Sequence, residues 1–406
     1  MVTMKNHNSN GLYGNPYKQQ SSFLKQKLPA LCGMLIVGLI FIFGNGFLFN
    51  NDRTVNLRMR STSGHAFVND RGNLVVPRLN PQVVYMDSYK GFYMLPEKEV
   101  KGILVHFHEC GHGGADFFIL PEDRIIAYEA LERGLAVLSM NSLDRMTRCW
   151  GWKSALGNAP PNGQKQFEDD IVVLSREKTV EKWSKKVGLK DDLPIMVLGA
   201  SNFVFYAWKA MKVQSIASYI LGYGSRLAGF HEDDADRKRN DPSYDLPNSI
   251  IFVHMAESDA ANDVGFYNSW LDDYVHITSK LIDVKPHADS FTADSCDRTI
   301  PELGFEQCQK LIDFIQQKYP HLLEKNQPNF KHVDWEPALL EAGMDNEKNK
   351  VAPRGLPTVS GNGHTWLYES VMEELNTVIG MNEMIASGKD IVLDFLMCHS
   401  NIGPCD

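Results

Sequence analysis

The chain has no long run of basic residues, and its formal net charge at pH 7 is −9. A nucleic acid is therefore not an expected partner, because phosphate binding needs a basic surface. No segment repeats with a period of about 20 to 50 residues, which excludes solenoids and propellers. The seven cysteines include no C-x-x-C spacing, so we expect neither a zinc site nor a redox dithiol, and no cofactor.

Charged residues are also missing from a long apolar segment near the N-terminus, residues 28–49. As a helix this segment is long enough to cross the roughly 30 Å hydrocarbon core of a bilayer. It is longer than the apolar region of a cleaved signal peptide, and it ends in bulky residues. We therefore expect a single-pass membrane anchor, preceded by a disordered polar tail at residues 1–27 and followed by a stalk at residues 50–80.

The orientation of this anchor is nearly balanced by the basic residues that flank it. Three lysines precede the segment and three arginines follow it: Lys18, Lys25, Lys27, Arg53, Arg58 and Arg60. The side of a membrane anchor with more lysine and arginine usually faces the cytoplasm, and here the two sides carry equal numbers. Our expectation that the N-terminus faces the cytoplasm therefore rests on analogy with similar anchors. The large domain would then lie in a lumen of the endomembrane system, although no N-x-Ser/Thr sequon is present.

Six cysteines lie outside the anchor, and they leave two interpretations open. In an oxidising compartment they would pair, with Cys296/Cys308 and Cys398/Cys405 as the local pairs. Alternatively, they are buried free thiols that pack as small apolar side chains.

Residues 81–406 alternate apolar strands with helices, in a chain of ordinary globular composition with 43% hydrophobic and 22% charged residues. The periodicity predicts strands at residues 82–86, 91–95, 102–108, 135–140, 195–198, 216–221, 250–255 and 275–284. It predicts helices at residues 121–133, 166–186, 302–319, 366–379 and 384–397. This alternation indicates an α/β domain whose mostly parallel sheet carries helices on both faces, followed by a helical C-terminal region.

A serine stands at the apex of a predicted strand-turn-helix junction. The strand at residues 195–198 leads into Gly199-Ala200-Ser201-Asn202, and a helix is predicted at residues 207–211. In the G-x-S-x-G pattern such a turn exposes a nucleophilic hydroxyl above the sheet edge. Here the first glycine and the serine are present, but Phe203 replaces the second glycine. The simpler interpretation is a strand that ends in a turn of small residues.

Glycines follow the strand predicted at residues 102–108, where a serine hydrolase carries part of its oxyanion hole. We expect the backbone N–H groups of Gly113 and Gly114, together with that of Asn202, to hold an oxyanion. Glycines leave these N–H groups accessible to a carbonyl oxygen. The alternative is that they form a flexible turn with no role in binding.

A carboxylate and a base are expected after later strands, in the order Ser, Asp, His. Asp259 follows the strand at residues 250–255, and it serves as the acid or else only as the N-cap of a helix. His287 follows the strand at residues 275–284 and is our expected base. His364, in the glycine-rich Gly361-Asn-Gly-His-Thr365, is the alternative base.

The sequence resembles the α/β-hydrolase superfamily, and within it a group of largely uncharacterised plant and algal proteins. The resembling stretches are His108–Gly114, Leu120–Asp123, Arg133–Leu138, Arg148–Trp150, Gly199–Ser201, Val253–Asp259 and Glu373–Asn376. The resemblance implies the fold and ester hydrolysis. It also implies a base in a His-Glu pair after the last of these stretches, where this chain has Asn382-Glu383. Asparagine cannot accept a proton at neutral pH.

Three hypotheses follow. The first is a membrane-anchored serine hydrolase of esterase or lipase type, acting on a small-molecule or lipid-like ester, with the Trp150/Trp152 loop beside the acyl pocket. The second is a catalytically inactive protein of the same fold that binds a small ligand or a partner, prompted by Phe203 and Asn382. The third is an anchored lumenal glycosyltransferase, which no D-x-D metal motif supports. The sequence sets no oligomeric state.

Overall fold

The computed structural model describes sixteen stretches of the chain: residues 66–68, 74–76, 78–109, 111–144, 148–150, 170–200, 204, 211–221, 248–254, 279–284, 291–324, 327–328, 334–346, 360, 363–379 and 384–405. The chain divides into two compact units, residues 1–50 and 51–406, and every described residue belongs to the second. The predicted tail and anchor therefore lie outside the described residues. Within these residues no helix is both long and apolar enough to cross a membrane.

The centre of the structure is an eight-stranded sheet in the order β10-β9-β8-β7-β5-β6-β4-β3. Its strands are β3 (Gln82–Met86), β4 (Tyr89–Met94), β5 (Gly102–Phe107), β6 (Leu135–Met140), β7 (Ile195–Ala200), β8 (Val213–Leu221), β9 (Asn248–His254) and β10 (Ser279–Val284). β4 is antiparallel to both of its neighbours, and every other neighbouring pair is parallel. This order and these directions are those of the α/β-hydrolase fold, which confirms the predicted fold class.

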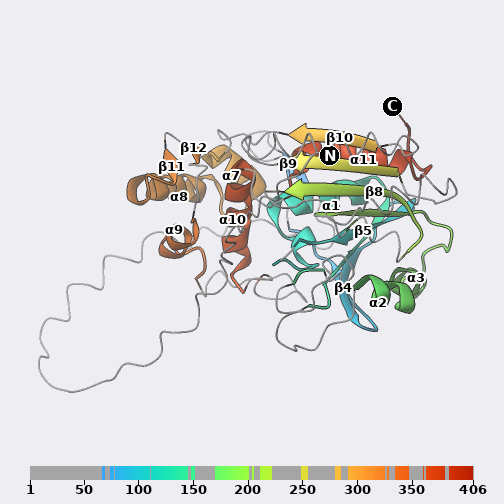
Figure 1. Ribbon diagram of the computed structural model, residues 1–406. Coiled ribbons are helices and arrows are strands. Elements are labelled where there is room, and N and C mark those ends of the chain that lie inside the picture. Colours follow the sequence, from blue (N-terminus) through green and yellow to red (C-terminus); the bar gives the residue numbers. More distant parts are fainter. Residues whose placement is uncertain are drawn as a thin grey trace, which may run out of the picture. The chain divides into compact units, whose positions relative to one another are not determined.

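Helices cover both faces of this sheet, as predicted (Figure 1). On one face α1 (Pro121–Glu132) and α11 (Lys389–Cys398) share a buried cluster with Leu104 of β5. On the other face α2 (Asp170–Glu177) and α3 (Thr179–Lys186) share a second cluster with Ile103 and Val105. Successive residues of β5 thus point to opposite faces and are buried on both, which explains why the strand is apolar throughout.

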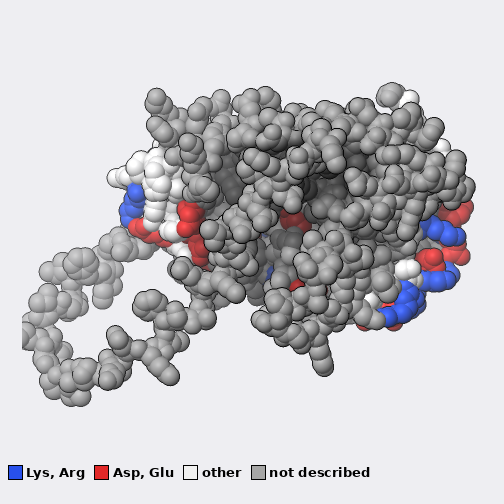
Figure 2. Space-filling model, viewed as in Figure 1, with Lys and Arg blue, Asp and Glu red and all other residues white. Residues whose placement is uncertain are grey.

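The helix predicted at residues 166–186 is two helices in its described part. Lys178 separates α2 from α3 and has a left-handed backbone, with φ 49° and ψ 48°. A left-handed residue interrupts the ladder of helical hydrogen bonds, and the periodicity of the sequence gives no sign of it. Beside these helices Lys and Arg side chains are interspersed with Asp and Glu at the surface (Figure 2). The pairs there include Lys190–Glu99, whose charged atoms lie 3.0 Å apart.

The C-terminal region is helical, as predicted. It contains α7 (Ala293–Thr299), α8 (Phe305–Lys318), α9 (Glu336–Glu341), α10 (Trp366–Ile379) and the short 3-10 helix η3 (Ala386–Gly388) before α11. α7 and α9 were not predicted. Small antiparallel pairs also occur, β1 (Phe67–Val68) with β2 (Leu74–Val75) and β11 (Leu323–Glu324) with β12 (Gln327–Pro328). β1 and β2 fall within the expected stalk, whose Val75 and Leu79 are buried.

The five described cysteines, all outside the predicted anchor, form disulfides. Cys296 of α7 is bonded to Cys308 of α8, and Cys398 at the end of α11 is bonded to Cys405, with Cα atoms 5.8 and 4.9 Å apart. Cys149 is also disulfide-bonded, to a cysteine outside the described residues. The two local pairs that the sequence offered are therefore confirmed, and the free-thiol alternative does not hold for these positions.

We expect that replacing both Cys296 and Cys308 with alanine lowers the free energy of unfolding by about 3 kcal/mol, because the bond closes a short loop in the unfolded chain. The two cysteines are separated by 12 residues in sequence. Urea unfolding of the oxidised wild type and the double variant measures the difference. Equal free energies of unfolding for the two proteins would contradict this prediction. As a control, a reducing agent should lower the free energy of unfolding more in the wild type than in the variant, because the variant has already lost this bond.

Candidate functional site at the carboxyl edge of the sheet

The three residues of the predicted triad follow strands that end at one edge of the sheet. Ser201 follows β7, Asp259 follows β9 and His287 follows β10, and these strands are parallel through β8. All three residues lie outside the described residues, as does Asn202. Figure 1 shows α7 and α10 on the side toward which these strands point. The candidate site is therefore this carboxyl edge.

The turn that carries Ser201 begins at a glycine that no larger residue can replace without movement of the chain. A Cβ at Gly199 would collide with the carbonyl oxygen of Phe107 at the end of β5, and it would lie 2.9 Å from Cγ2 of Val204. Val204 is helical and fully buried. A strand end and a helix start thus approach each other closely around the serine, as the first glycine of the pattern requires. Phe203 lies outside the described residues.

The glycine loop after β5 holds the predicted oxyanion donors, and both are hydrogen-bonded to side chains. Gly113 N–H donates to Oδ2 of Asp116 at 2.8 Å, and Gly114 N–H donates to Oδ1 of Asn141 at 2.7 Å. A Cβ at Gly114 would lie 2.8 Å from the carbonyl oxygen of Ser139. The loop therefore passes so close to the backbone of β6 that only glycine fits at this position. An oxyanion would reach these two donors only by displacing Asp116 and Asn141.

Two histidines at the end of β5 are committed to the scaffold. His106 is buried, with Nδ1 2.8 Å from Oγ of Ser139 and its ring stacked on Phe117 at 3.8 Å between centroids. Burial, followed by the neighbouring His108, holds the pKa of His106 well below its usual range. His108 accepts the Ser142 N–H at Nε2, over 3.1 Å, so its Nδ1 carries the proton and donates to the carbonyl of Glu109 over 2.8 Å. Neither ring is placed to act as a base.

His364, the alternative base, has a carboxylate partner. Its Nδ1 lies 2.9 Å from Oδ2 of Asp345, and its side chain is 29% exposed. The second oxygen of this carboxylate accepts the N–H of Thr365 at 2.6 Å. A histidine with one nitrogen fixed by a carboxylate is the arrangement of a general base and its orienting group. Sequence reasoning found this histidine but missed Asp345.

Two of the resembling stretches, Leu120–Asp123 and Glu373–Asn376, meet at the start of α1. Glu122 N–H donates to Oε2 of Glu373 at 3.2 Å, and Glu122 accepts the N–H of Ala386. Glu122 and Glu374 are hydrogen-bonded to each other through their carboxyl groups. Burial raises the pKa of Glu122, and burial together with the charge of Glu122 raises that of Glu374 well above its usual range. Each buried carboxyl group thus holds its proton more tightly than an exposed carboxyl group does.

The raised pKa of Glu374 makes a prediction about stability. A carboxyl whose pKa is raised by folding contributes stability that is complete below its unfolded pKa and is lost as the pH rises through its folded pKa. Glu374→Gln imitates the protonated form, so we expect it to remove a slope of up to about 1.4 kcal/mol per pH unit. Urea unfolding from pH 5 to 9 measures this, with the exposed Glu181→Gln as the control. Parallel curves for wild type and Glu374→Gln would refute it.

Trp150, expected to lie beside an acyl pocket, is a core residue instead. It is 7% exposed and packs edge-on against Phe107, with ring centroids 4.8 Å apart. It belongs to the cluster beneath the sheet face covered by α2 and α3. Trp152 lies outside the described residues. Of the predicted loop, the described tryptophan therefore packs against the end of β5.

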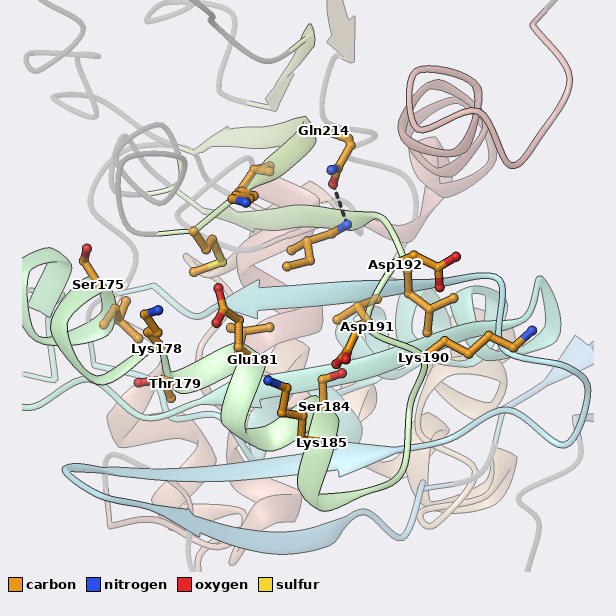
Figure 3. Close-up of a pocket in the computed structure, with 18 of the residues that line it drawn as sticks. Ser175, Lys178, Thr179, Glu181, Ser184, Lys185, Lys190, Asp191, Asp192 and Gln214 are labelled. Carbon is orange, nitrogen blue, oxygen red and sulfur yellow. Dashed lines mark hydrogen bonds between the residues drawn. The ribbon is translucent and has the colours of Figure 1, made fainter.

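A cleft of about 1220 Å³ opens at the opposite, amino edge of the sheet (Figure 3). Ile103, Ile195 and Val213 line it near the starts of their strands. Charged side chains come from Lys178, which precedes α3, and from Glu181 and Lys185 of α3. Of the predicted site residues that the structure describes, Gly113, Gly114 and His364, none lines this cleft. The histidine in its described lining, His399, makes no hydrogen bond to a nucleophilic side chain among the described residues. Size alone therefore does not make this cleft the reactive site.

Comparisons place the chain only distantly among solved structures. No protein-family model matches it, and no curated protein matches its sequence. The Francisella virulence factor BioJ is 12% identical, with 60% of this chain and 86% of that one covered and a TM-score of 0.35. Carboxyl esterase 2 of the mycorrhizal fungus Tuber melanosporum is 12% identical, with 51% and 77% covered and a TM-score of 0.30. The serine hydrolase XC6422 of Xanthomonas campestris is 13% identical, with 60% and 97% covered and a TM-score of 0.32.

Proposed function

We propose that the protein is a membrane-anchored serine hydrolase of esterase or lipase type, in which Ser201 is the nucleophile. The Ser201 hydroxyl would attack an ester carbonyl while a histidine accepts its proton. Backbone N–H groups, among them those of Asn202, Gly113 and Gly114, would hold the oxyanion. The base is His287, with Asp259 as its acid, or it is His364.

The observation that carries this proposal is the position of β7, the strand that directly precedes Ser201 in the sequence. It directly follows β7, which lies between β5 and β8, and the strand ends at the crowded Gly199. In the α/β-hydrolase fold this position holds the nucleophile, at the start of a helix whose N–H groups favour developing negative charge. The fold alone does not establish an activity, so the proposal of ester hydrolysis depends on Ser201.

The disulfides support placing the domain in a lumen or outside the cell, because such bonds persist in oxidising compartments. The apolar segment at residues 28–49 would hold the domain at the membrane, where apolar and lipid-like esters are concentrated. Protease treatment of intact, sealed membrane vesicles tests this orientation. Protection of the domain from protease supports it, and digestion without detergent would contradict it.

A second candidate function is binding without catalysis. The occupied N–H groups of Gly113 and Gly114 favour it, because an oxyanion must compete there with the carboxylate of Asp116. Phe203 and Asn382 motivate it from the sequence. A protein of this kind would bind a ligand or a partner at the carboxyl edge and leave it unchanged.

One experiment separates these functions. The full-length protein in detergent is treated with a fluorophosphonate probe, and the modified peptide is identified by mass spectrometry. Serine hydrolases react because their nucleophile is activated, so we expect one adduct, on Ser201, that heat-unfolded protein does not form. A folded wild-type protein that gains no adduct would refute the hydrolase and support the binding protein. An adduct on another serine would refute Ser201 as the nucleophile.

A further inference from the structure

Arg148 carries a charge that no described side chain balances. One of its nitrogens, Nη1, is buried without a hydrogen-bond partner. Among the residues that the structure describes, the guanidinium forms neither a hydrogen bond nor an ion pair. A guanidinium stays charged at every physiological pH, and burying a charge without a partner is strongly unfavourable. The described scaffold therefore gives no reason for an arginine at this position.

The part of this side chain that solvent reaches has the shape of an anion site. The residue is partly exposed, and Nε and Nη2 are not among the buried nitrogens, so both stay in contact with solvent. Their N–H bonds point to the same side of the planar guanidinium. They can therefore donate two parallel hydrogen bonds to two oxygens of one anion, which is the arrangement in which arginine binds carboxylates and phosphates.

The backbone of Arg148 is fixed in a conformation that a long side chain rarely adopts. Its φ is 54°, in the left-handed region. Such a conformation persists only where the surrounding structure holds it, and it is frequent at ligand-binding sites. The next two residues supply that hold, because Cys149 is disulfide-bonded and Trp150 is buried against the end of β5. The guanidinium is thus presented from an anchored segment.

This segment lies at the carboxyl edge of the sheet, beside the glycine loop. The ring of Trp150 is 4.8 Å from that of Phe107, the last residue of β5, between centroids. Consecutive Cα atoms are 3.8 Å apart, so the Cα of Arg148 lies within about 8 Å of that of Trp150. Where the same segment leaves β6, Asn141 accepts the N–H of Gly114 at 2.7 Å. Arg148 is therefore on the opposite edge from the large cleft.

Two other arginines show how this chain holds a guanidinium that serves the scaffold. Arg124 is buried, and its Nη1 lies 3.0 Å from Oε1 of Glu302. Arg133 has a side chain that is 19% exposed, and its Nη2 lies 2.7 Å from Oδ1 of Asp390. Each of these charges is balanced by a carboxylate of another helix or loop. Arg148 departs from this pattern among the described residues.

We propose that Arg148 binds an oxyanion, a carboxylate or a phosphate, carried by the ligand of the carboxyl edge. Nε and Nη2 donate to two oxygens of that group, and its charge balances the charge that the burial of Nη1 leaves unfavourable. The proposal goes beyond the proposed function, because it holds whether the protein hydrolyses this ligand or only binds it. An acidic group on the ligand is what it adds.

Titration of the full-length protein in detergent with inorganic phosphate or with acetate tests this site. Each probe is added at constant ionic strength, with chloride as the balancing ion, and the rise in unfolding temperature gives an apparent Kd. We expect Arg148→Gln to raise the Kd of the anion that binds by about tenfold or more, because charge-assisted hydrogen bonds are lost. Arg148→Lys should fall between, since lysine keeps the charge without the paired donors. Arg176→Gln removes the same charge from α2, where the side chain is 53% exposed, and should change the Kd less than twofold.

The stability of the anion-free protein gives a second readout. Arg148→Met keeps an unbranched side chain and removes the unbalanced charge, so we expect it to raise the unfolding temperature by about 2 °C. An arginine that served the scaffold would instead be missed, and its replacement would lower the unfolding temperature. That result would overturn the proposal.

The titrations decide the proposal separately from the hydrolase. Equal Kd values for wild type, Arg148→Gln and Arg148→Lys would overturn it, as would a wild type that neither probe stabilises beyond the effect of chloride. Binding of phosphate alone would assign a phosphorylated ligand, and binding of acetate alone would assign a carboxylic acid. A wild type that binds an anion through Arg148 but gains no fluorophosphonate adduct would refute the hydrolase and leave this site in place.

Discussion

Replacing Ser201 with alanine is expected to lower kcat for an activated ester by a factor on the order of 10⁴ or more, because no other group can form the acyl intermediate. The residue directly follows β7 at the edge of the sheet where the glycine loop also lies. KM should change little, since substrate binding does not depend on the nucleophile. Initial rates measured at several substrate concentrations give both constants.

A matched control for this experiment is Ser175→Ala, an exposed serine near the end of α2. It should hydrolyse the ester at the wild-type rate, because a surface hydroxyl outside the site has little effect on stability or binding. An alanine variant of Ser201 that keeps the wild-type rate would remove the nucleophile from the mechanism. The hydrolysis would then have to arise elsewhere on the protein or from a contaminant.

The fold could be predicted from the sequence because its signals are local. Central strands such as β5, β6 and β7 are short, mostly apolar runs, and β3 and β4 contain polar residues among the apolar ones. All eight predicted strands are present in the sheet. The alternation of apolar and polar residues at 82–86 and 91–95 is typical of an antiparallel entry to the sheet, and β3 and β4 do pair in that way. The order of the strands depends on pairing between distant segments. The alternation of strands and helices predicted only that most pairs would be parallel.

The contacts of the candidate site could be predicted only in part, for the same physical reason. Asp116 lies three residues after Gly113, so its bond to that N–H is local and of a kind that short polar side chains form. Asn141 lies 27 residues from Gly114, and only the pairing of β5 with β6 brings the two together. No sequence pattern indicated that bond.

The partner of His364 illustrates the same limit. Asp345 lies 19 residues away in sequence, and the bond depends on how the end of α9 meets the start of α10. From the sequence, His364 was only a histidine in a glycine-rich loop and the alternative base. Tertiary packing supplied the carboxylate, which periodicity and motif spacing do not encode.

Replacing Gly199 with alanine is expected to lower the free energy of unfolding by about 3 kcal/mol or more, and to reduce the activity of whatever folded protein remains. The added Cβ would collide with the carbonyl oxygen of Phe107, which is part of the β5 backbone and cannot turn away as a side chain could. The movement that relieves this collision would separate the ends of β5 and β7, and so would displace Ser201 from the glycine loop.

Two further variants test this cause. Gly113→Ala should cost less than Gly199→Ala, because its Cβ would meet only the side chains of Asn141 at 3.3 Å and Asp116 at 4.0 Å. Trimming Val204 to alanine in the Gly199→Ala background should not restore stability, since the backbone oxygen of Phe107 remains in place. Restored stability would assign the collision to the Val204 side chain. A Gly199→Ala protein as stable as the wild type would show that the two strand ends do not approach each other this closely.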